Sequence, residues 1–235
     1  MKPLYLSETV RNGLGTCLRP GGSALTERIL ELLTPNCNSR LLDAGCGTGA
    51  SMTILQERGF KRCVGIDLSY DLLGEARRKG QTVLQGNVAR LPLADENFDI
   101  LFCECVWNLT AKKQTLAEFA RVLKPGGMLA IADIYARADA GSESRSWPVT
   151  CCFSQATDQA TVKEQITEAG FTVTVVEDHT RLLNKTAAEF VFAHGSLQGF
   201  WQAVTGSAEL AAAACNASAA TRPGLFLLLA QRNRP

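Results

Sequence analysis

The feature that most constrains the fold is a short apolar strand that runs into a cluster of glycines. It is the segment Arg40-Leu-Leu-Asp-Ala-Gly-Cys-Gly-Thr-Gly49. Gly45 and Gly47 have no Cβ, so a ligand can approach their backbone closely. A second apolar strand, Val64-Gly-Ile-Asp-Leu68, places Asp67 about twenty positions later, where a carboxylate usually binds the two hydroxyls of a ribose. Together the two segments predict a cofactor that contains a nucleoside.

Strand patterns alternate with helix patterns along most of the chain. Strands are expected at 40–44, 63–66, 82–85, 99–103, 128–133, 171–176 and 224–230, and helices at 50–58, 70–79, 112–122 and 158–169. This alternation predicts an α/β fold with a doubly wound sheet of mostly parallel strands. Ligands of such sheets bind beyond the carboxyl ends of the strands. Five polar residues fall at those ends: Asp43, Asp67, Asn87, Glu104 and Asp133.

Further motifs follow in a fixed order. The third strand ends at Asn87 and runs into Leu91-Pro92, Asn97-Phe98-Asp99 opens the fourth strand, and Leu123-Lys-Pro-Gly-Gly-Met128 leads into the fifth. This ordered set resembles the class I S-adenosylmethionine-dependent methyltransferases, most closely the ubiquinone/menaquinone-biosynthesis and arsenite-methyltransferase branch, over residues 38–180. The resemblance implies a Rossmann-like, seven-stranded sheet. The glycine run alone also fits the looser dinucleotide pattern, so a nicotinamide oxidoreductase stays open.

The resemblance implies S-adenosyl-L-methionine as the cofactor and S-adenosyl-L-homocysteine as its product. Gly45 and Gly47 would leave room for the methionine portion and the ribose, and Asp43 would order that loop. Asp67 would accept hydrogen bonds from the ribose hydroxyls, a charge-assisted interaction.

The next strand ends supply the remaining cofactor contacts implied by the resemblance. Leu68 would pack on the adenine, Asn87 would bond its amine, and Val88 would offer its backbone amide. Cys103 and Glu104 follow the fourth strand, and the Cys103 carbonyl would bind the amino group of the cofactor. Most relatives carry aspartate where this chain has Asn87.

Methyl transfer from a sulfonium does not require one universal catalytic residue. The electrophile is already activated by its charge, so the protein mainly aligns donor and acceptor and excludes water. Candidates on the acceptor side are Glu104, Asn108 and His179. A histidine can act as a general base near neutral pH, although His179 also fits a partly exposed loop position.

The adjacent pair Cys151-Cys152 suggests a second reading. Arsenite methyltransferases carry a cysteine in the same stretch, and paired thiolates suit a soft metalloid. A thiol-metalloid methyltransferase that uses Cys151 and Cys152 is therefore an alternative function. A zinc site would need two more ligands at plausible spacing, and none is evident, so no metal site is expected. A protein that binds the cofactor without catalysis is a further alternative.

The chain divides by pattern into four parts. Residues 1–37 form an N-terminal segment, irregular to about 22 and then helical, and 38–180 form the cofactor-binding core. Residues 181–221 read as a helical insertion, with one helix near 183–204 and an alanine-rich helix at 207–220. Residues 222–235 supply the final strand. An insertion at that corner is expected to act as a lid or a dimer surface.

Composition limits the partners and the compartment. The chain has 235 residues, 46% of them hydrophobic, and a net charge of +1, so no nucleic-acid partner is expected. The sequence has no run of about eighteen apolar residues, so no membrane span is expected. The N-terminus lacks the apolar core of a signal peptide. Nine cysteines without a Cys-x-x-Cys pair argue against a disulfide scaffold. We expect a cytoplasmic enzyme with a small-molecule acceptor; the oligomeric state stays open.

Overall fold

A seven-stranded sheet forms the centre of the protein. The computed structural model describes residues 3–138 and 147–234. The strand order is β3-β2-β1-β4-β5-β7-β6, and β7 runs antiparallel to both its neighbours while the pairs from β3 to β5 are parallel. The strands are β1 (Leu41–Ala44), β2 (Cys63–Asp67), β3 (Val83–Gln85), β4 (Phe98–Glu104), β5 (Leu123–Ala136), β6 (Phe171–Asp178) and β7 (Pro223–Arg232). The predicted doubly wound, mostly parallel sheet is confirmed.

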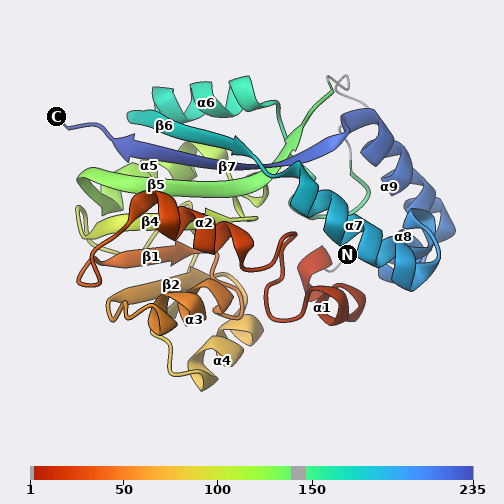
Figure 1. Ribbon diagram of the computed structural model, residues 1–235, viewed down its shortest axis with the longest axis horizontal. Coiled ribbons are helices and arrows are strands. Elements are labelled where there is room, and N and C mark those ends of the chain that lie inside the picture. Colours follow the sequence, from red (N-terminus) through yellow and green to blue (C-terminus); the bar gives the residue numbers. More distant parts are fainter. Residues whose placement is uncertain (1–2, 139–146, 235) are drawn as a thin grey trace.

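Helices cover both faces of the sheet (Figure 1). Side chains of a strand alternate between faces, and β4 shows this clearly: Leu101 and Cys103 pack in one core, Ile100 and Phe102 in the other. The first core includes α5 (Lys112–Val122) and α6 (Gln159–Glu168), and the second includes α2 (Ala24–Leu33) and α3 (Ala50–Glu57). The helix α4 (Tyr70–Arg78) packs beside β2 and β3.

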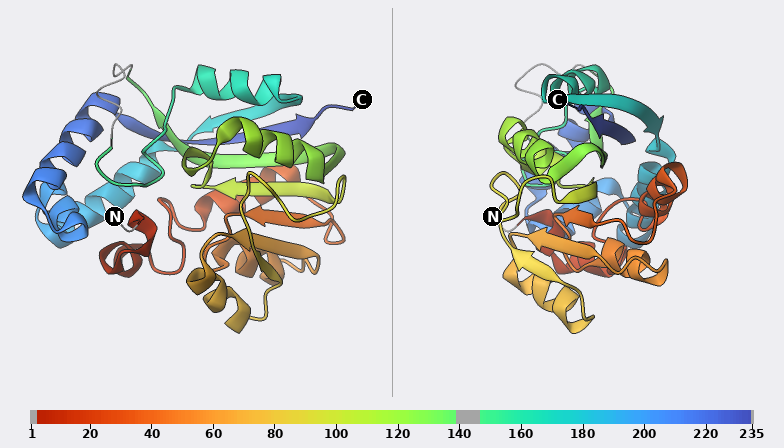
Figure 2. Two further views of the ribbon diagram at one scale, coloured as in Figure 1. Left: turned by 180° about the vertical axis from the view of Figure 1, so that it is seen from behind. Right: turned by 90° about the vertical axis from the view of Figure 1, so that its left-hand side faces the viewer.

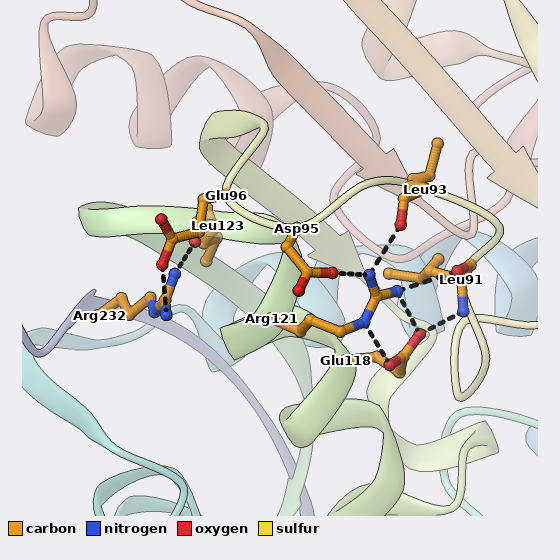
Figure 3. Close-up of polar contacts among 8 residues, drawn as sticks. All are labelled: Leu91, Leu93, Asp95, Glu96, Glu118, Arg121, Leu123 and Arg232. Atoms are coloured by element: carbon orange, nitrogen blue, oxygen red, sulfur yellow. Dashed lines mark hydrogen bonds and ion pairs between the residues drawn. The ribbon is translucent and has the colours of Figure 1, made fainter. Parts of the chain in front are cut away.

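Arg121 on α5 fixes the segment that follows β3 (Figure 3). Its guanidinium donates to the Leu91 carbonyl at 3.0 Å, the Leu93 carbonyl at 2.8 Å and Asp95 at 2.6 Å, and it forms two bonds of 2.8 Å with Glu118. The Glu118 carboxylate also accepts the Leu91 amide at 2.6 Å. These bonds position the segment that connects β3 to β4. The first residues of this segment lie at the carboxyl end of the sheet.

The N-terminal segment is helical rather than irregular. It contains a short 3-10 turn, η1 (Leu4–Leu6), and the helix α1 (Glu8–Leu14). The Ser7 hydroxyl accepts the Val10 amide at 3.1 Å and so caps α1. The prediction of an irregular stretch was wrong because α1 has only 7 residues and includes a glycine. A helix this short depends on tertiary contacts, here including the ion pair from Arg11 to Glu75 on α4.

Three helices stand between β6 and β7, as the prediction of a helical insertion required. They are α7 (Thr180–His194), α8 (Leu197–Thr205) and α9 (Ala208–Thr221). The single helix expected near 183–204 is divided, because Gly195 adopts a left-handed φ of 76° and Ser196 then caps α8. Figure 2 shows α1 and these three helices gathered at one end of the sheet, where β5 finishes. No helix in the described residues is long and apolar enough to cross a bilayer.

Candidate cofactor and acceptor site

A cavity of about 230 Å³ opens at the carboxyl ends of the parallel strands. We call it the strand-end cavity. Its walls come from the glycine loop after β1, from Asp67 and Leu68 after β2, and from Gly86 to Ala89 after β3. Glu104 to Val106 at the end of β4 complete this side. The sheet therefore brings together most of the residues that the sequence placed at strand ends.

The glycine loop needs its glycines for two different reasons. Gly45 has φ 86°, and a Cβ there would lie 2.2 Å from the Val106 side chain. Gly47 has φ 53°, and a Cβ there would meet open space, with its nearest neighbour 4.0 Å away. Both backbones occupy the left-handed region that favours glycine. The loop therefore packs against Val106, in the chain after β4, at Gly45 and leaves space at Gly47.

Asp67 joins the glycine loop to the end of β2. One carboxylate oxygen accepts the Gly47 amide at 2.9 Å, and the other accepts the Ser69 amide at 2.8 Å. Burial raises the pKa of Asp67, and these backbone donors oppose that shift. A carboxylate oxygen can accept more than one hydrogen bond, so Asp67 keeps acceptor capacity for a ligand in the cavity.

An exposed apolar side chain adjoins that carboxylate. Leu68 is 63% exposed although it lines the cavity, so a flat ring could cover it. Asn87 lies across the same cavity, where its side-chain oxygen accepts the Ala89 amide at 2.9 Å and fixes the turn. An amide oxygen has a second lone pair available. Val88 also lines this cavity.

A buried charge network lies beneath the loop. Arg19 Nε is 3.2 Å from Glu104, and Thr26 and Ser51 donate their hydroxyls to Glu104, each at 2.9 Å. Arg19 also donates to the Thr26 hydroxyl at 2.6 Å. Asp43 is buried nearby, and one of its oxygens has no hydrogen-bond partner among the described residues. Burial, followed by the negative charge of Glu104, raises the pKa of Asp43 to about 7.

This network changes the expectation for the end of β4. Cys103 is fully buried and does not line the strand-end cavity, because β4 continues one residue further to Glu104. Glu104 does line it, and its carboxylate is paired with Arg19. Sequence reasoning missed Arg19, which lies in a segment without a recognisable pattern.

The other two acceptor-side candidates are held in structural contacts. Asn108 is buried, and its side-chain amide donates to Asp133 at 3.1 Å and to the Ile134 and Cys152 carbonyls at 2.6 and 2.8 Å. Asn108 therefore connects the chain after β4 to the backbone at Ile134 and Cys152, and it lines neither cavity. His179 Nε2 is 2.9 Å from a Glu177 carboxylate oxygen, and it too lies outside both linings. The structure does not bring His179 to the site.

A second cavity, of about 340 Å³, adjoins the first. We call it the aromatic cavity, because Trp147, Phe153, Phe190, Phe200 and Trp201 line it. The ring centres of Trp147 and Phe153 are 4.8 Å apart, and those of Trp147 and Trp201 are 5.7 Å apart. Most of this wall belongs to α7, α8 and the segment after residue 146. Sequence analysis placed Phe190, Phe200 and Trp201 in the helical insertion and gave Trp147 and Phe153 no role.

The two cavities meet. Four residues line both of them: Tyr5, Leu18, Cys105 and Leu109. Two come from the N-terminal segment and two from the chain after β4. The two cavities are therefore adjacent, and mostly apolar side chains stand at their boundary.

Three potential metal ligands gather at this junction. The sulfur atoms of Cys105 and Cys152 and a carboxylate oxygen of Asp133 all lie within 4.8 Å of one another. A thiol–thiol hydrogen bond with Cys105, together with burial, raises the pKa of Cys152 well above its usual range. The sequence showed no further ligand beside Cys152, whereas the fold brings Cys105 and Asp133 close to it. Its neighbour Cys151 lines the aromatic cavity but lies outside the cluster, and burial raises its pKa to about 11.

Comparison with known proteins shows what this chain is similar to. Residues 42–131, less than half of the chain, match the methyltransferase domain family. The central part of the chain is therefore similar to a methyltransferase domain. The methyltransferase GfsG of Streptomyces halstedii is 33% identical over 51% of this chain and 46% of its own length. The arsenite methyltransferase of Halobacterium salinarum is 30% identical over 56% of this chain and 37% of its own length.

A solved structure shows the same fold. Phosphoethanolamine N-methyltransferase 2 of Haemonchus contortus, in complex with S-adenosyl-L-methionine, has a TM-score of 0.75 at 18% identity, over 96% of this chain and 56% of that one. The chain spans about half the length of the curated relatives it matches first. The matched methyltransferase domain holds β1 to β4 and the glycine loop, whereas most of the aromatic cavity lies outside it.

Proposed function

We propose that this protein transfers a methyl group from S-adenosyl-L-methionine to a small-molecule acceptor in the aromatic cavity. The observation that carries the proposal is the junction of two unlike cavities. One has the glycine loop, the carboxylate and the exposed leucine that suit an adenosyl group, and the other is lined mainly by apolar and aromatic side chains. They share four lining residues, so donor and acceptor would meet there.

The fit of the strand-end cavity to the cofactor rests on the residues already described. Asp67 would accept the ribose hydroxyls through charge-assisted bonds. Leu68 offers apolar surface to the adenine, and Asn87 keeps a lone pair for its amine. The open space at Gly47 would admit the ribose and the methionine portion. Asp43 supports the loop from below, with a buried oxygen that lacks a protein partner among the described residues.

The cofactor supplies, when bound, a methyl group activated by a positively charged sulfur. The residues of this chain orient the two ligands and exclude water. Tyr5, Leu18 and Leu109 form the walls of the junction, which favours alignment of donor and acceptor without a charged group between them. The buried pair of Arg19 and Glu104 holds the N-terminal segment against the end of β4.

Titration calorimetry with S-adenosyl-L-methionine tests the cofactor assignment. We expect wild-type protein to bind it, and Asp67→Ala to bind it at least 10-fold more weakly, from the cost of about 1.5–3 kcal/mol for a lost hydrogen bond to a charged group. Asp71→Ala is the matched control, because Asp71 is an exposed residue of α4 outside both cavities. Tighter binding of a nicotinamide dinucleotide would replace the proposal with an oxidoreductase.

A second experiment tests the transfer itself. The protein is incubated with a cell extract and cofactor that carries an isotopically labelled methyl group, and mass spectrometry searches for labelled small molecules. A labelled product that depends on the protein is expected. Cofactor binding with no labelled product in any extract would favour a protein that binds the cofactor without catalysis.

The thiol cluster favours a second candidate, methyl transfer to a soft metalloid such as trivalent arsenic. Two cysteines meet at the junction, and thiolates are the preferred ligands of soft ions. Arsenous acid would form two arsenic–sulfur bonds with Cys105 and Cys152, and the two thiol protons would leave with two hydroxides as water. Arsenite binding that is lost in Cys105→Ser and Cys152→Ser, but kept in the exposed control Cys37→Ser, would support this candidate.

We also propose a role for the parts outside the core. Residues 181–221 would act as a lid over the acceptor, since α7 and α8 form much of the aromatic wall. The core of 38–180 would hold the cofactor, with 222–235 completing the sheet and 1–37 closing the junction. The cysteine content supports a cytoplasmic location.

A further inference from the structure

Two arginines, both exposed, belong to the lining of the aromatic cavity beyond the end of β5. The described lining of this cavity includes Arg137 and Arg222 but no aspartate or glutamate. The Arg137 side chain donates to the Arg222 carbonyl at 3.0 Å, and the Arg137 amide donates to the Thr221 carbonyl at 3.1 Å. Hydrogen bonds to backbone carbonyls thus hold these two arginines close together beside an apolar surface, although their like charges repel.

One nearby carboxylate has other partners. Asp178 lies close enough to Arg137 for the charge to help lower its pKa. It accepts the Tyr135 hydroxyl and the Thr180 amide, both at 2.7 Å, and it does not line the cavity. Asp178 therefore has hydrogen-bond partners of its own and offsets part of the Arg137 charge from outside the cavity lining.

The backbone of Arg222 is strained. It has φ 46°, in the left-handed region, at the C-cap of α9, where glycine is the favoured residue. An arginine inside the last turn would complement the helix dipole without this strain. Cys105, at the junction with the strand-end cavity, has φ 55°. Strained residues that the surrounding structure enforces tend to occur at functional sites, and both of these line the same cavity.

The thiol cluster and the two arginines are well separated along β5. Asp133 belongs to the thiol cluster at the junction, and Arg137 follows four residues later in the same extended segment. At about 3.3 Å per residue, their Cα atoms lie about 13 Å apart. An acceptor that reaches from the junction to the arginines must therefore have a body on the order of 10 Å long.

We propose that the acceptor is an amphipathic anion. Its carboxylate, sulfonate or phosphate group is bound by Arg137 and Arg222, its apolar body lies against Trp147, Phe153 and Trp201, and its methyl-accepting atom lies at the junction. Guanidinium groups bind such anions through paired, charge-assisted hydrogen bonds. This inference rests on the proposed function, because it takes the aromatic cavity as the acceptor site.

Two dyes of nearly the same shape test the proposal. 1-Anilinonaphthalene-8-sulfonate is anionic, and N-phenyl-1-naphthylamine lacks the sulfonate. Both gain fluorescence in apolar cavities, and both should quench the tryptophans of the wall. We expect wild-type protein to bind the anionic dye about 10-fold or more tightly than the neutral one, as hydrogen bonds to charged groups allow. Equal affinity for the two dyes would overturn the proposal.

Variants locate the preference. Arg137→Gln with Arg222→Gln should reduce the affinity for the anionic dye to that for the neutral dye and leave the neutral dye unaffected. Arg181→Gln is the control, since Arg181 is an exposed residue of α7 outside the cavity. Arg222→Gly should raise the melting temperature by relieving strain while it weakens binding of the anionic dye. An unchanged preference for the anionic dye in the double variant would refute the site.

Calorimetry with S-adenosyl-L-methionine on the same variants separates the two proposals. Cofactor affinity should not change in Arg137→Gln or Arg222→Gln. If the cofactor binds normally but the dyes are not discriminated, only the anion site fails. If the cofactor does not bind wild-type protein, the proposed function fails, whatever the dyes show.

Discussion

Removing Arg19 should destabilise the protein strongly. Its side chain and that of Glu104 are 9% and 2% exposed, so water screens their interaction little. In Arg19→Met, the Glu104 charge would stay buried without its cation, next to the buried Asp43. Breaking a buried pair from one side costs about 3–5 kcal/mol of unfolding free energy. Because Thr26 and Ser51 still donate to Glu104, we expect the lower end, about 3 kcal/mol.

The reverse change should cost less. In Glu104→Gln, Arg19 keeps its bond to Thr26 and the field of Asp43, so a loss of about 1–3 kcal/mol is expected. The double variant should lose less than the sum of the two, with a coupling of about 0.5–3 kcal/mol. The cost of Arg19→Met should shrink at pH 5, because Asp43, with a pKa of about 7, is then protonated and no longer adds a second buried negative charge.

Urea unfolding followed by circular dichroism measures these values. Arg11→Met is the matched control, since Arg11 pairs with Glu75 at a site that is 36% and 26% exposed. Such a pair is worth at most about 1 kcal/mol. If Arg19→Met costs no more than Arg11→Met, or if the two changes at the buried pair add fully, the pair does not hold the N-terminal segment in the way proposed.

Three further outcomes are expected. In the calorimetric titration proposed above, Asp67→Ala should keep its native circular dichroism spectrum, so that the loss of cofactor affinity reports binding and not unfolding. The pKa of Asp43 is raised to about 7, against an unfolded value near 3.8, so the folded state binds more protons between those pH values. The unfolding free energy should therefore fall as pH rises from 5 to 7. Asp43→Asn should flatten this pH dependence in urea titrations, and an unchanged pH dependence would contradict the assignment. Gly45→Ala should lower the melting temperature, because its Cβ would lie 2.2 Å from Val106 at φ 86°, and a native melting curve would disprove the close contact.

The cofactor side of the site was predictable because it is encoded locally. Each strand end carries its own polar or glycine residue, and parallel pairing brings those ends to one edge of the sheet. Gly45, Gly47, Asp67 and Asn87 therefore meet in one cavity, as their positions in the sequence required. Cys103 does not line that cavity, since β4 continues through it to Glu104.

The acceptor side depends on contacts between distant segments, which no local pattern reveals. Tyr5 reaches the junction because the Leu4 amide donates to the Thr150 carbonyl at 3.0 Å. The N-terminal segment is also bound to the glycine loop by a hydrogen bond of 2.8 Å from the Thr48 hydroxyl to the Thr16 carbonyl. Cys105 and Cys152 meet only when the segment after β5 folds back over the end of β4.

The division between the two sides bears on how the acceptor can be identified. The strand-end cavity lies largely within the matched domain, so relatives with that domain share its framework. The aromatic wall, Tyr5, Arg137 and Arg222 all lie outside residues 42–131. Similarity to a relative over the matched region therefore carries little information about the acceptor. That information has to come from the second cavity itself, where a thiol pair at the junction and two arginines beyond β5 give different predictions for a metalloid and for an organic anion.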